Sequence, residues 1–467
     1  MLRKGETICA PATSAGGAIA VIRMSGPQSF TITERVFFAS DKTLDINKQP
    51  GNMVIHGEIR DGLEIIDEVL LTVFRAPRSY TGEDSVEISC HASKYIITRV
   101  LELLLRYGAI AALPGEFTQR AFFNGKMDLS QAEAVADLVA SSSKASHDIA
   151  MNQMRGGFSA KIAKLRSVLL RFASLIELEL DFGEEDVEFA DRQELMKIIM
   201  EAKGLTDDLA SSFSVGNAIK NGIPVAIIGK PNSGKSTLLN ALLNEERAIV
   251  SEIPGTTRDT IEDTIIINGV EYRFTDTAGL RDTSDVIENL GIRKTHEKIG
   301  QSSVVLFVDD ILDEAGPINR RISNVRDILK GSGTSLIILI NKSDLLSSGG
   351  VASLKEQIIT QEDELLLFIS AKQRTGLDEL RREVDDLAVK KKLKSDDVII
   401  TNIRHYEAMI NVSKSLGRII SGIDEKLPED LIAIDLRQAI HYLGEVTGEI
   451  TSDEILDNIF RNFCIGK

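Results

Sequence analysis

The sequence is poor in cysteine and in long apolar runs, and each shortage excludes a class of protein. Its 467 residues include only three cysteines, Cys9, Cys90 and Cys464. They are too few and too scattered for a disulfide framework or a thiolate metal site, which fits a reducing compartment. No apolar run reaches the roughly 20 residues of a membrane span, and the N-terminal stretch has no signal-peptide core. We therefore expect a cytoplasmic protein.

Positive charge is also in short supply. Lys and Arg number 54 against 70 Asp and Glu, which gives a net charge of −16. This balance argues against a protein that coats nucleic acid by bulk electrostatics, because phosphate binding requires clustered cations. Any contact with RNA should be local or carried by a partner. The length predicts about three domains.

One stretch stands out, Gly229 to Ser236, whose sequence G-K-P-N-S-G-K-S fits the P-loop pattern. It follows the apolar run 223–228 and precedes the helical pattern 237–243. Such a loop directs backbone N–H groups and a helix N-terminus at phosphate. Lys235 would add a cation and catalytic charge, and Ser236 a hydroxyl for Mg²⁺. The alternative is a plain glycine turn between a strand and a helix.

Three further motifs follow apolar runs, in the order expected of guanine-nucleotide hydrolases. They are D-T-A-G at 276–279, N-K-S-D at 341–344 and S-A-K at 370–372. The Asp344 carboxylate suits the two adjacent donors, N1–H and the 2-amino group, that guanine offers and adenine does not. We expect Asn341 to hold the loop and the base edge, and the Ala371 backbone N–H to serve the guanine oxygen. Asp276 should reach Mg²⁺ through water.

The segment G-T-T-R-D at 255–259 lies between the P-loop and D-T-A-G, where a threonine is needed to complete the magnesium shell. We assign that role to Thr257. The residues expected to contact GTP are Asn232, Ser233, Gly234, Lys235, Ser236, Thr237, Ser251, Glu252, Ile253, Pro254, Gly255, Thr256, Thr257, Asp276, Thr277, Ala278, Gly279, Asn341, Lys342, Ser343, Asp344, Ser370 and Ala371.

Leu280 follows D-T-A-G, where Ras-type enzymes place the glutamine that orients the attacking water. Hydrolysis must therefore use another device. Candidates are a catalytic carboxylate such as Glu288 and an extra cation that offsets transition-state charge. Asn232 offers a neutral oxygen for such a cation, although on local grounds it reads first as a turn residue after Pro231.

The rest of the chain predicts a multidomain fold in which an α-helical domain is interrupted by an inserted α/β P-loop GTPase domain of Ras type. Strands are expected at 18–24 and 64–74 and helices at 28–38 and 95–107, which makes the N-terminal region α+β. Long helical periodicity follows, and a helix over 195–213 should end before Gly216, Asn217 and Gly222 at a domain boundary. The expected domains are an N-terminal α+β domain at 1–125, helical parts at 126–220 and 391–467, and the GTPase domain at 221–390.

These motifs, the domain order and the terminal Cys464-Ile465-Gly466-Lys467 (C-I-G-K) together resemble the tRNA-modification GTPases of the MnmE (TrmE) family over essentially the whole chain. Era-like and Der-like GTPases share the GTPase motifs, whereas the C-I-G-K terminus discriminates. Its rival interpretation is a prenylation box, for which Lys467 is a poor last residue.

The resemblance implies a homodimer formed through an N-terminal domain similar to tetrahydrofolate-binding folds, with 5-formyl-tetrahydrofolate or a related one-carbon donor as ligand. On the matching positions Arg23, Glu87 and Lys126 would contact the folate, and Lys467 would approach the same pocket. Relatives usually carry a Gly-His-Gly-Gly turn where this chain has Cys90, His91, Ala92 and Ser93, so we expect a differently shaped loop.

The resemblance further implies a potassium-stimulated GTPase whose GTPase domains dimerise across the nucleotide. Asn232, Ser251, Ile253 and Thr256 would bind K⁺, and Glu288 would orient the attacking water.

A further implication is a complex with an FAD- and NADH-using MnmG-type protein, in a heterotetramer or larger assembly. The complex would add an aminomethyl or carboxymethylaminomethyl group to C5 of the wobble uridine of certain tRNAs, with the partner holding much of the tRNA. Cys464 could be a nucleophile or a spectator thiol. The alternative function is a regulatory Era- or Der-like switch in ribosome assembly.

Overall fold

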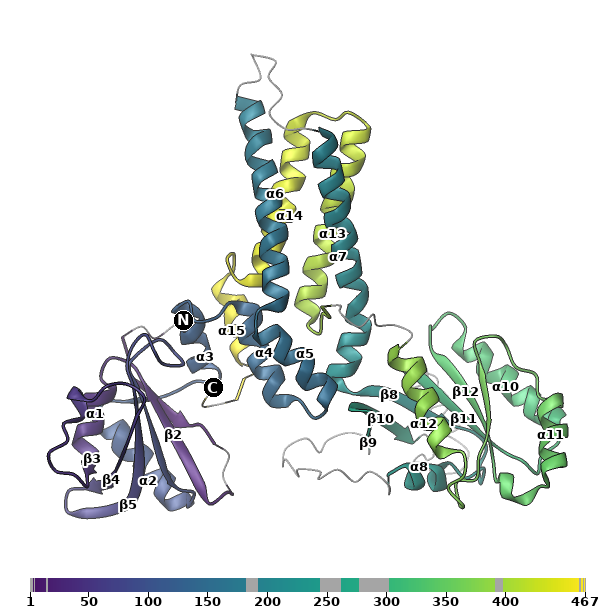
Figure 1. Cartoon of the computed structure of the whole chain (residues 1–467), viewed down its shortest axis with the longest axis horizontal. Helices are drawn as coiled ribbons and strands as arrows, with labels where there is room; N and C mark the ends of the chain where they lie inside the picture. The colour runs from purple at the N-terminus through teal and green to yellow at the C-terminus, as the bar shows by residue number, and fades with distance from the viewer. Residues whose placement is uncertain are drawn as a thin grey trace, which may run out of the picture. The chain divides into compact units, whose positions relative to one another are not determined.

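The computed structural model describes residues 3, 5–13, 16–181, 192–243, 262–276, 302–390, 398–461, 463–464 and 466. The chain divides into two compact units (Figure 1). The first unit comprises Met1–Ala140, Ala150–Lys203 and Asn411–Lys467, and the second comprises Ser141–Ile149 and Gly204–Ile410. Within the described part of the chain, no helix is both long and apolar enough to cross a membrane.

The N-terminal part of the first unit is a mostly antiparallel sheet backed by helices. Its described strands run in the order β3-β4-β5-β6-β2-β1-β7, and β7 pairs with β1 in parallel. The strands are β1 (Ile8–Pro11), β2 (Ile19–Ser25), β3 (Phe37–Ala39), β4 (Met53–Asp61), β5 (Glu64–Phe74), β6 (Ser85–His91) and β7 (Ile110–Ala111).

Helices α1 (Ser29–Val36) and α2 (Lys94–Arg106) pack on the apolar face of this sheet. Alternate residues of β5, such as Leu71 and Val73, are buried there because successive strand side chains point to opposite faces. The expected strands at 18–24 and 64–74 and the helix at 95–107 are confirmed, whereas the helix expected at 28–38 ends at Val36 and Phe37–Ala39 form β3. Helix α3 (Glu116–Phe123) and a short turn η1 (Ile46–Lys48) complete it.

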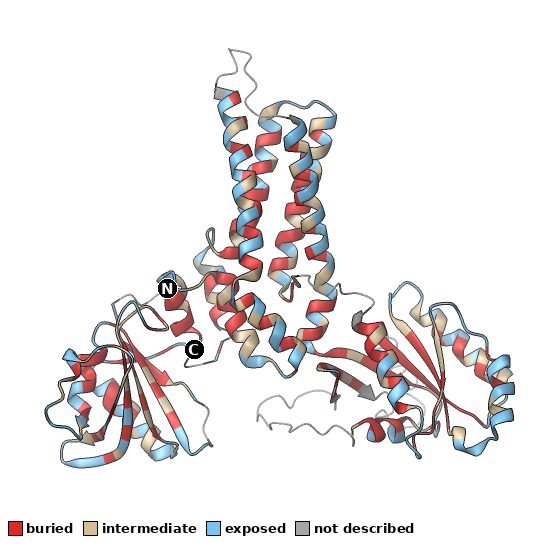
Figure 2. Ribbon diagram, viewed as in Figure 1, coloured by how far each residue is buried: buried red, intermediate tan, exposed pale blue. Residues whose placement is uncertain are grey.

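The remaining described helices form long, regularly buried stripes (Figure 2). They are α4 (Leu129–Ala140), α5 (Lys144–Met154), α6 (Gly157–Asp181), α7 (Arg192–Asn221), α13 (Ile403–Asp424), α14 (Glu429–Thr447) and α15 (Asp453–Arg461). Helix α14 packs along α6 although more than two hundred residues separate the two helices in the sequence. A separation of roughly this length is what an inserted domain of ordinary size would produce. Helical sequence on the two sides of the insert thus joins, as predicted.

The second unit contains a doubly wound sheet whose described strands run in the order β13-β12-β11-β8-β10-β9. All of its neighbours pair in parallel except β9 and β10, which form a hairpin. The strands are β8 (Ile223–Ile228), β9 (Glu262–Ile267), β10 (Val270–Asp276), β11 (Val304–Asp310), β12 (Ser335–Asn341) and β13 (Leu365–Phe368). The carboxyl ends of the parallel strands meet at one edge, where such sheets bind their ligands.

Both faces of this sheet are covered. Helices α8 (Lys235–Leu243) and α12 (Leu377–Asp385) pack on one face, and α10 (Ala315–Leu329) and α11 (Ser348–Gln357) on the other. The short turn η3 (Ser343–Leu345) follows β12, and a π-helical turn η4 (Asp386–Lys390) follows α12. The predicted fold class is confirmed: an α+β domain comes first in the sequence, and a helical domain with an inserted Ras-like α/β domain follows it.

Two elements hold the β9–β10 hairpin. The Tyr272 hydroxyl donates to Asp385 over 2.8 Å, and Asn268 Nδ2 donates to the same carboxylate over 2.9 Å. Burial, reinforced by Asp385, raises the pKa of Tyr272. From the other side, the Ala145 N–H donates to the Gly269 carbonyl over 2.9 Å. Strand β10, which ends at Asp276, is thereby anchored to α12 and to the start of α5.

The predicted end of helix α7 is wrong. The helix continues through Gly216 and Asn217 and ends at Asn221, just before Gly222, whose φ is +79°. Gly216 is buried against the segment at 400, where an added Cβ would lie 2.2 Å from the Ile400 carbonyl oxygen. The glycine therefore permits close packing inside the helix instead of ending it.

The two glycines of α7 give a matched test of this packing. Gly216→Ala should destabilise the protein by about 1–3 kcal/mol, because the methyl group overlaps the Ile400 carbonyl. Gly204→Ala should stabilise it by up to about 1 kcal/mol, because Gly204 is exposed with nothing within 4 Å of the added Cβ and alanine favours helix. Thermal unfolding followed by circular dichroism measures both. Equal effects of the two substitutions would contradict the packing explanation.

Candidate functional site

The P-loop lies between β8 and α8 and depends on its glycines. Gly229 and Gly234 have φ values of +148° and +96°. An added Cβ at Gly229 would lie 2.0 Å from the Val308 carbonyl oxygen, and at Gly234 it would lie 2.2 Å from Asn341 Nδ2. Any side chain at these positions would push the loop away from β11 and from the N-K-S-D motif.

The polar groups of the P-loop are arranged around the start of α8. Lys235 Nζ donates to the Gly229 and Lys230 carbonyl oxygens over 2.8 and 2.7 Å. Ser236 and Thr237 are exposed in the first turn of the helix, where unpaired N–H groups favour anions. Ser233 Oγ is buried without a hydrogen-bond partner among the described residues. An oxygen-rich ligand such as phosphate matches this set of donors.

Asn341 joins three of the predicted loops. Its Nδ2 donates to the Ser233 carbonyl in the P-loop over 2.8 Å, and its Oδ1 accepts the Ala371 N–H over 3.0 Å. Asp344 is exposed and accepts a hydrogen bond from Ser370 Oγ over 2.5 Å. The P-loop, N-K-S-D and S-A-K, far apart in the sequence, therefore meet at one edge of the sheet.

Other predicted residues are placed less completely. The Asp276 backbone pairs beside Ile227, so β10 ends next to the strand that enters the P-loop. Residues Ser251 to Thr257, Thr277 to Gly279, Glu288 and Lys467 lie outside the described residues.

The sequence reasoning missed Lys230 and three acidic residues at the end of β11 and just after it, which the structure places against the P-loop and the N-K-S-D loop. Lys230 Nζ lies 2.6 Å from Asp313, and Lys342 Nζ lies 2.6 Å from Asp310. The available signal was a run of acidic residues directly after an apolar strand in a parallel sheet, because such residues emerge at the ligand edge.

In the first unit, Arg23 is the centre of a second polar cluster. Its Nε and Nη2 lie 2.9 and 2.8 Å from Glu87 Oε1, and its guanidinium lies over the rings of Tyr80 and Phe117, 5.2 and 5.7 Å from their centroids. Arg23 Nη1 also donates to the Gly466 carbonyl over 3.3 Å. Arg23 and Glu87 are thus together, and the residue before Lys467 lies beside them.

Lys126 is connected to the loop that carries Tyr80. Its Nζ donates to the Pro77 carbonyl over 2.9 Å. One ion pair fixes that loop to α3, since the buried Arg120 of α3 lies 3.0 Å from Glu83. Within α3, Arg120 also lies 3.2 Å from Glu116.

The C-terminal tail packs against the N-terminal strands. Gly466 has a φ of +97°, and an added Cβ would lie 2.1 Å from the Pro11 carbonyl oxygen. The Gly115 N–H donates to the Cys464 carbonyl over 3.4 Å. Cys464 is exposed, whereas burial raises the pKa of Cys9 to about 12 and that of Cys90 to about 11. Of the three thiols, Cys464 is the one that solvent reaches.

Cys90 and His91 are the last residues of β6, and Asp67 contacts His91. The His91 N–H and Nδ1 each lie 2.8 Å from a carboxylate oxygen of Asp67, while the imidazole is 71% exposed. This carboxylate therefore holds the end of β6, where a differently shaped loop was expected at Cys90 to Ser93.

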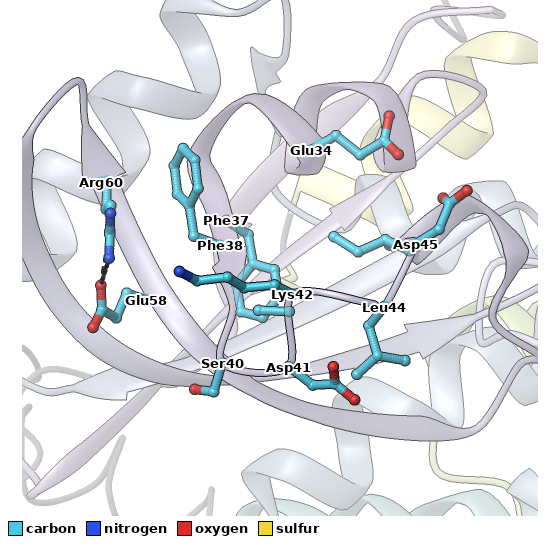
Figure 3. A pocket seen from close by; sticks show the side chains of 12 residues that line it. Glu34, Phe37, Phe38, Ser40, Asp41, Lys42, Leu44, Asp45, Glu58 and Arg60 are labelled. Carbon is cyan, nitrogen blue, oxygen red and sulfur yellow. Dashed lines mark hydrogen bonds and ion pairs between the residues drawn. The ribbon is translucent and has the colours of Figure 1, made fainter.

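A cavity of about 610 Å³ lies elsewhere in the first unit, between α1, β3 and the loop before η1 (Figure 3). It contains none of the predicted site residues. Lys42 and Arg60 both line the cavity, and Arg60 lies 2.6 Å from Glu58 and over the Phe38 ring, so the charge of Arg60 is already paired within the wall.

Comparison with known proteins links both units to one group. A family model described as the MnmE helical domain matches residues 129–464, and one described as the GTP-binding protein TrmE N-terminus matches residues 7–126. The tRNA modification GTPase MnmE of Bacteroides thetaiotaomicron is 50% identical over 464 residues, covering 99% of both chains. The protein of the same name in Flavobacterium psychrophilum is 52% identical over 464 residues, with the same coverage.

Substitutions at Asn341 and Asp344 distinguish two roles: Asn341 joins the loops, and Asp344 is expected to contact the ligand. Asn341→Ala leaves the Ser233 carbonyl and the Ala371 N–H without their partner, so we expect a loss of stability of about 1–3 kcal/mol for each and weaker GTP binding. Asp344→Ala removes an exposed carboxylate and should weaken GTP binding with little change in stability. Thermal unfolding and binding of a fluorescent GTP analogue measure both effects, and unchanged stability of Asn341→Ala would contradict its joining role.

Proposed function

This chain belongs to the MnmE family of tRNA modification GTPases, and we propose that it couples GTP hydrolysis to modification of C5 of the wobble uridine of certain tRNAs. The observation that carries the proposal is the meeting of the P-loop, N-K-S-D and S-A-K around Asn341, in a chain that matches its relatives over both units. A nucleotide held there would have its phosphates at α8 and its base at Asp344.

Guanine selection would rest on Asp344. Its carboxylate is exposed and would accept the N1–H and 2-amino donors of the base, while Ser370 keeps it oriented. The Ala371 N–H donates to Asn341 in this structure, so it would have to be shared or released to serve the guanine oxygen. An adenine nucleotide would leave the carboxylate without these donors.

The phosphates would be held by Lys235, the N–H groups at the start of α8 and the Ser233 hydroxyl. Ser236 presents an exposed hydroxyl at the same turn and would bind Mg²⁺ together with Thr257 and, through water, Asp276. When bound, Mg²⁺ neutralises charge on the phosphate oxygens.

Hydrolysis would proceed without a Ras-type glutamine, because Leu280 occupies that position. Glu288 would orient the water, and Asn232 would bind K⁺ with oxygens of Ser251, Ile253 and Thr256. Support for Asn232 comes from its place in the P-loop, where the residue is exposed and has a φ of +62°.

The first unit would supply the one-carbon chemistry and the dimer contact. Arg23 and Glu87, with Lys126 and Lys467, would bind 5-formyl-tetrahydrofolate or a related tetrahydrofolate. Their pairing offers a cation and a carboxylate side by side, which suits a ligand that carries both a carboxylate and ring N–H donors. A second copy of the chain and an MnmG-type FAD protein would complete the assembly, and that partner would hold most of the tRNA, in keeping with the net charge of −16.

Nucleoside analysis of tRNA tests the proposal directly. Cells that lack this chain should lose the C5 modification of the wobble uridine, and the intact gene should restore it. A Lys235→Ala gene should not restore it, because the phosphate-binding cation is missing. An unchanged wobble uridine in the deletion strain contradicts the proposal and favours the switch function in ribosome assembly.

A comparison of salts tests the proposed cation site. The purified protein should hydrolyse GTP at least about tenfold faster in K⁺ than in Na⁺, a difference of about 1.4 kcal/mol in the barrier. Asn232→Ala should hydrolyse GTP at the same slow rate in both salts. Asn240→Ala, an exposed asparagine within α8, is the matched control and should keep the preference for K⁺. Equal rates of the unmodified protein in the two salts would remove the role proposed for Asn232.

A further inference from the structure

The acidic segment Asp309–Asp313, D-D-I-L-D, comprises the last two residues of β11 and the first three residues of the turn that leads to α10. We call it the acidic bracket, because its three carboxylates contact two separate loops of the nucleotide site. None of them belongs to the GTPase motifs identified in the sequence.

One side of the bracket holds the P-loop. Lys230 Nζ lies 2.6 Å from Asp313 Oδ2 and 3.9 Å from Asp309 Oδ1. Arg321 of α10 closes the cluster, with Nε 2.7 Å from Asp309 and Nη2 2.5 Å from Asp313. Two cations and two carboxylates thus balance in charge, which the full burial of Asp309 requires.

The other side of the bracket holds the N-K-S-D loop. Lys342 Nζ donates to Asp310 Oδ2 over 2.6 Å, and the Ile311 N–H donates to the Asn341 carbonyl over 3.0 Å. Lys342 has a φ of +65°, which side-chain-bearing residues rarely adopt, so its conformation depends on such contacts.

The carboxylates of the bracket favour their charged forms. The hydrogen bond from Lys230 lowers the pKa of Asp313. Burial is the largest single effect and would raise the pKa of Asp310, but the hydrogen bonds from Lys342 and the Leu312 N–H, together with the charges of Lys342 and Lys230, outweigh it and lower the pKa. Both ion pairs are therefore formed at neutral pH.

We propose that the acidic bracket positions the phosphate loop and the guanine loop at a fixed separation and thereby sets the affinity for GTP. Lys230 anchors the peptide whose carbonyl accepts the Lys235 ammonium, and Lys342 precedes the base-reading Asp344 by two residues. A nucleotide has a limited length between base and phosphates, so loops already held at the right separation bind it with less loss of conformational freedom. Asp310, Asp313 and Lys230 are positioning residues that act through these loops.

The inference rests on the proposed GTPase function and is tested on GTP turnover by the purified full-length protein. Asp310→Asn and Lys230→Met should each raise KM for GTP about tenfold while kcat at saturating GTP changes less than about twofold. Lys230→Arg keeps the charge that faces Asp313 and should restore most of the affinity.

Glu364→Gln is the matched control. Arg326 of α10 lies 2.6 Å from Glu364, an ion pair on the same helix as Arg321 that touches neither nucleotide loop. The control should lower thermal stability and leave KM unchanged. If Asp310→Asn and Lys230→Met lower stability as this control does and leave KM unchanged, the positioning role is wrong. No GTP turnover by the unmodified protein would instead overturn the proposed function itself.

Discussion

The nucleotide site of the second unit depends on one side chain, the amide of Asn341. This amide donates to the P-loop and accepts from S-A-K at the same time, so three loops that are far apart in the sequence are held at one edge of the sheet. Gly234 makes this possible, since an added Cβ would occupy the place of Asn341 Nδ2. The amide is 2% exposed, so water cannot replace either bond, and its removal leaves two buried backbone groups unpaired.

Other polar contacts hold further loops and the hairpin of the same sheet. The acidic bracket holds the P-loop and N-K-S-D through ion pairs, and Asp385 holds the β9–β10 hairpin through Tyr272. The carboxylates that make these contacts lie outside the GTPase motifs. A parallel sheet aligns its strand ends but leaves the loops free to differ, so buried polar contacts must determine their conformations.

In the first unit, two segments that are distant in the sequence are held together where glycine lets their backbones pack closely. Gly466 and Gly115 both have positive φ, and both lie where a Cβ would collide with backbone, at Pro11 and at Phe460. They allow the C-terminal tail to lie beside Arg23, and so they bring a residue from the end of the chain next to a pair formed within the N-terminal sheet. The C-terminal tail is thereby joined to Arg23, one of the residues proposed to bind folate.

The sequence by itself determined the fold class, the strand-loop-helix at 223–243 and the order of the GTPase motifs, because apolar periodicity and glycine requirements are local. It also pointed to Asn341, Asp344 and Lys235 from motif chemistry alone. Only the tertiary structure decided that Gly216 lies inside α7, because the glycine is needed there for close packing against the Ile400 carbonyl, which is far along the chain. Only the tertiary structure showed that Lys230 pairs with Asp313 and Arg23 with Gly466. The residues next to a charge or a glycine in the sequence do not indicate which distant group it will contact.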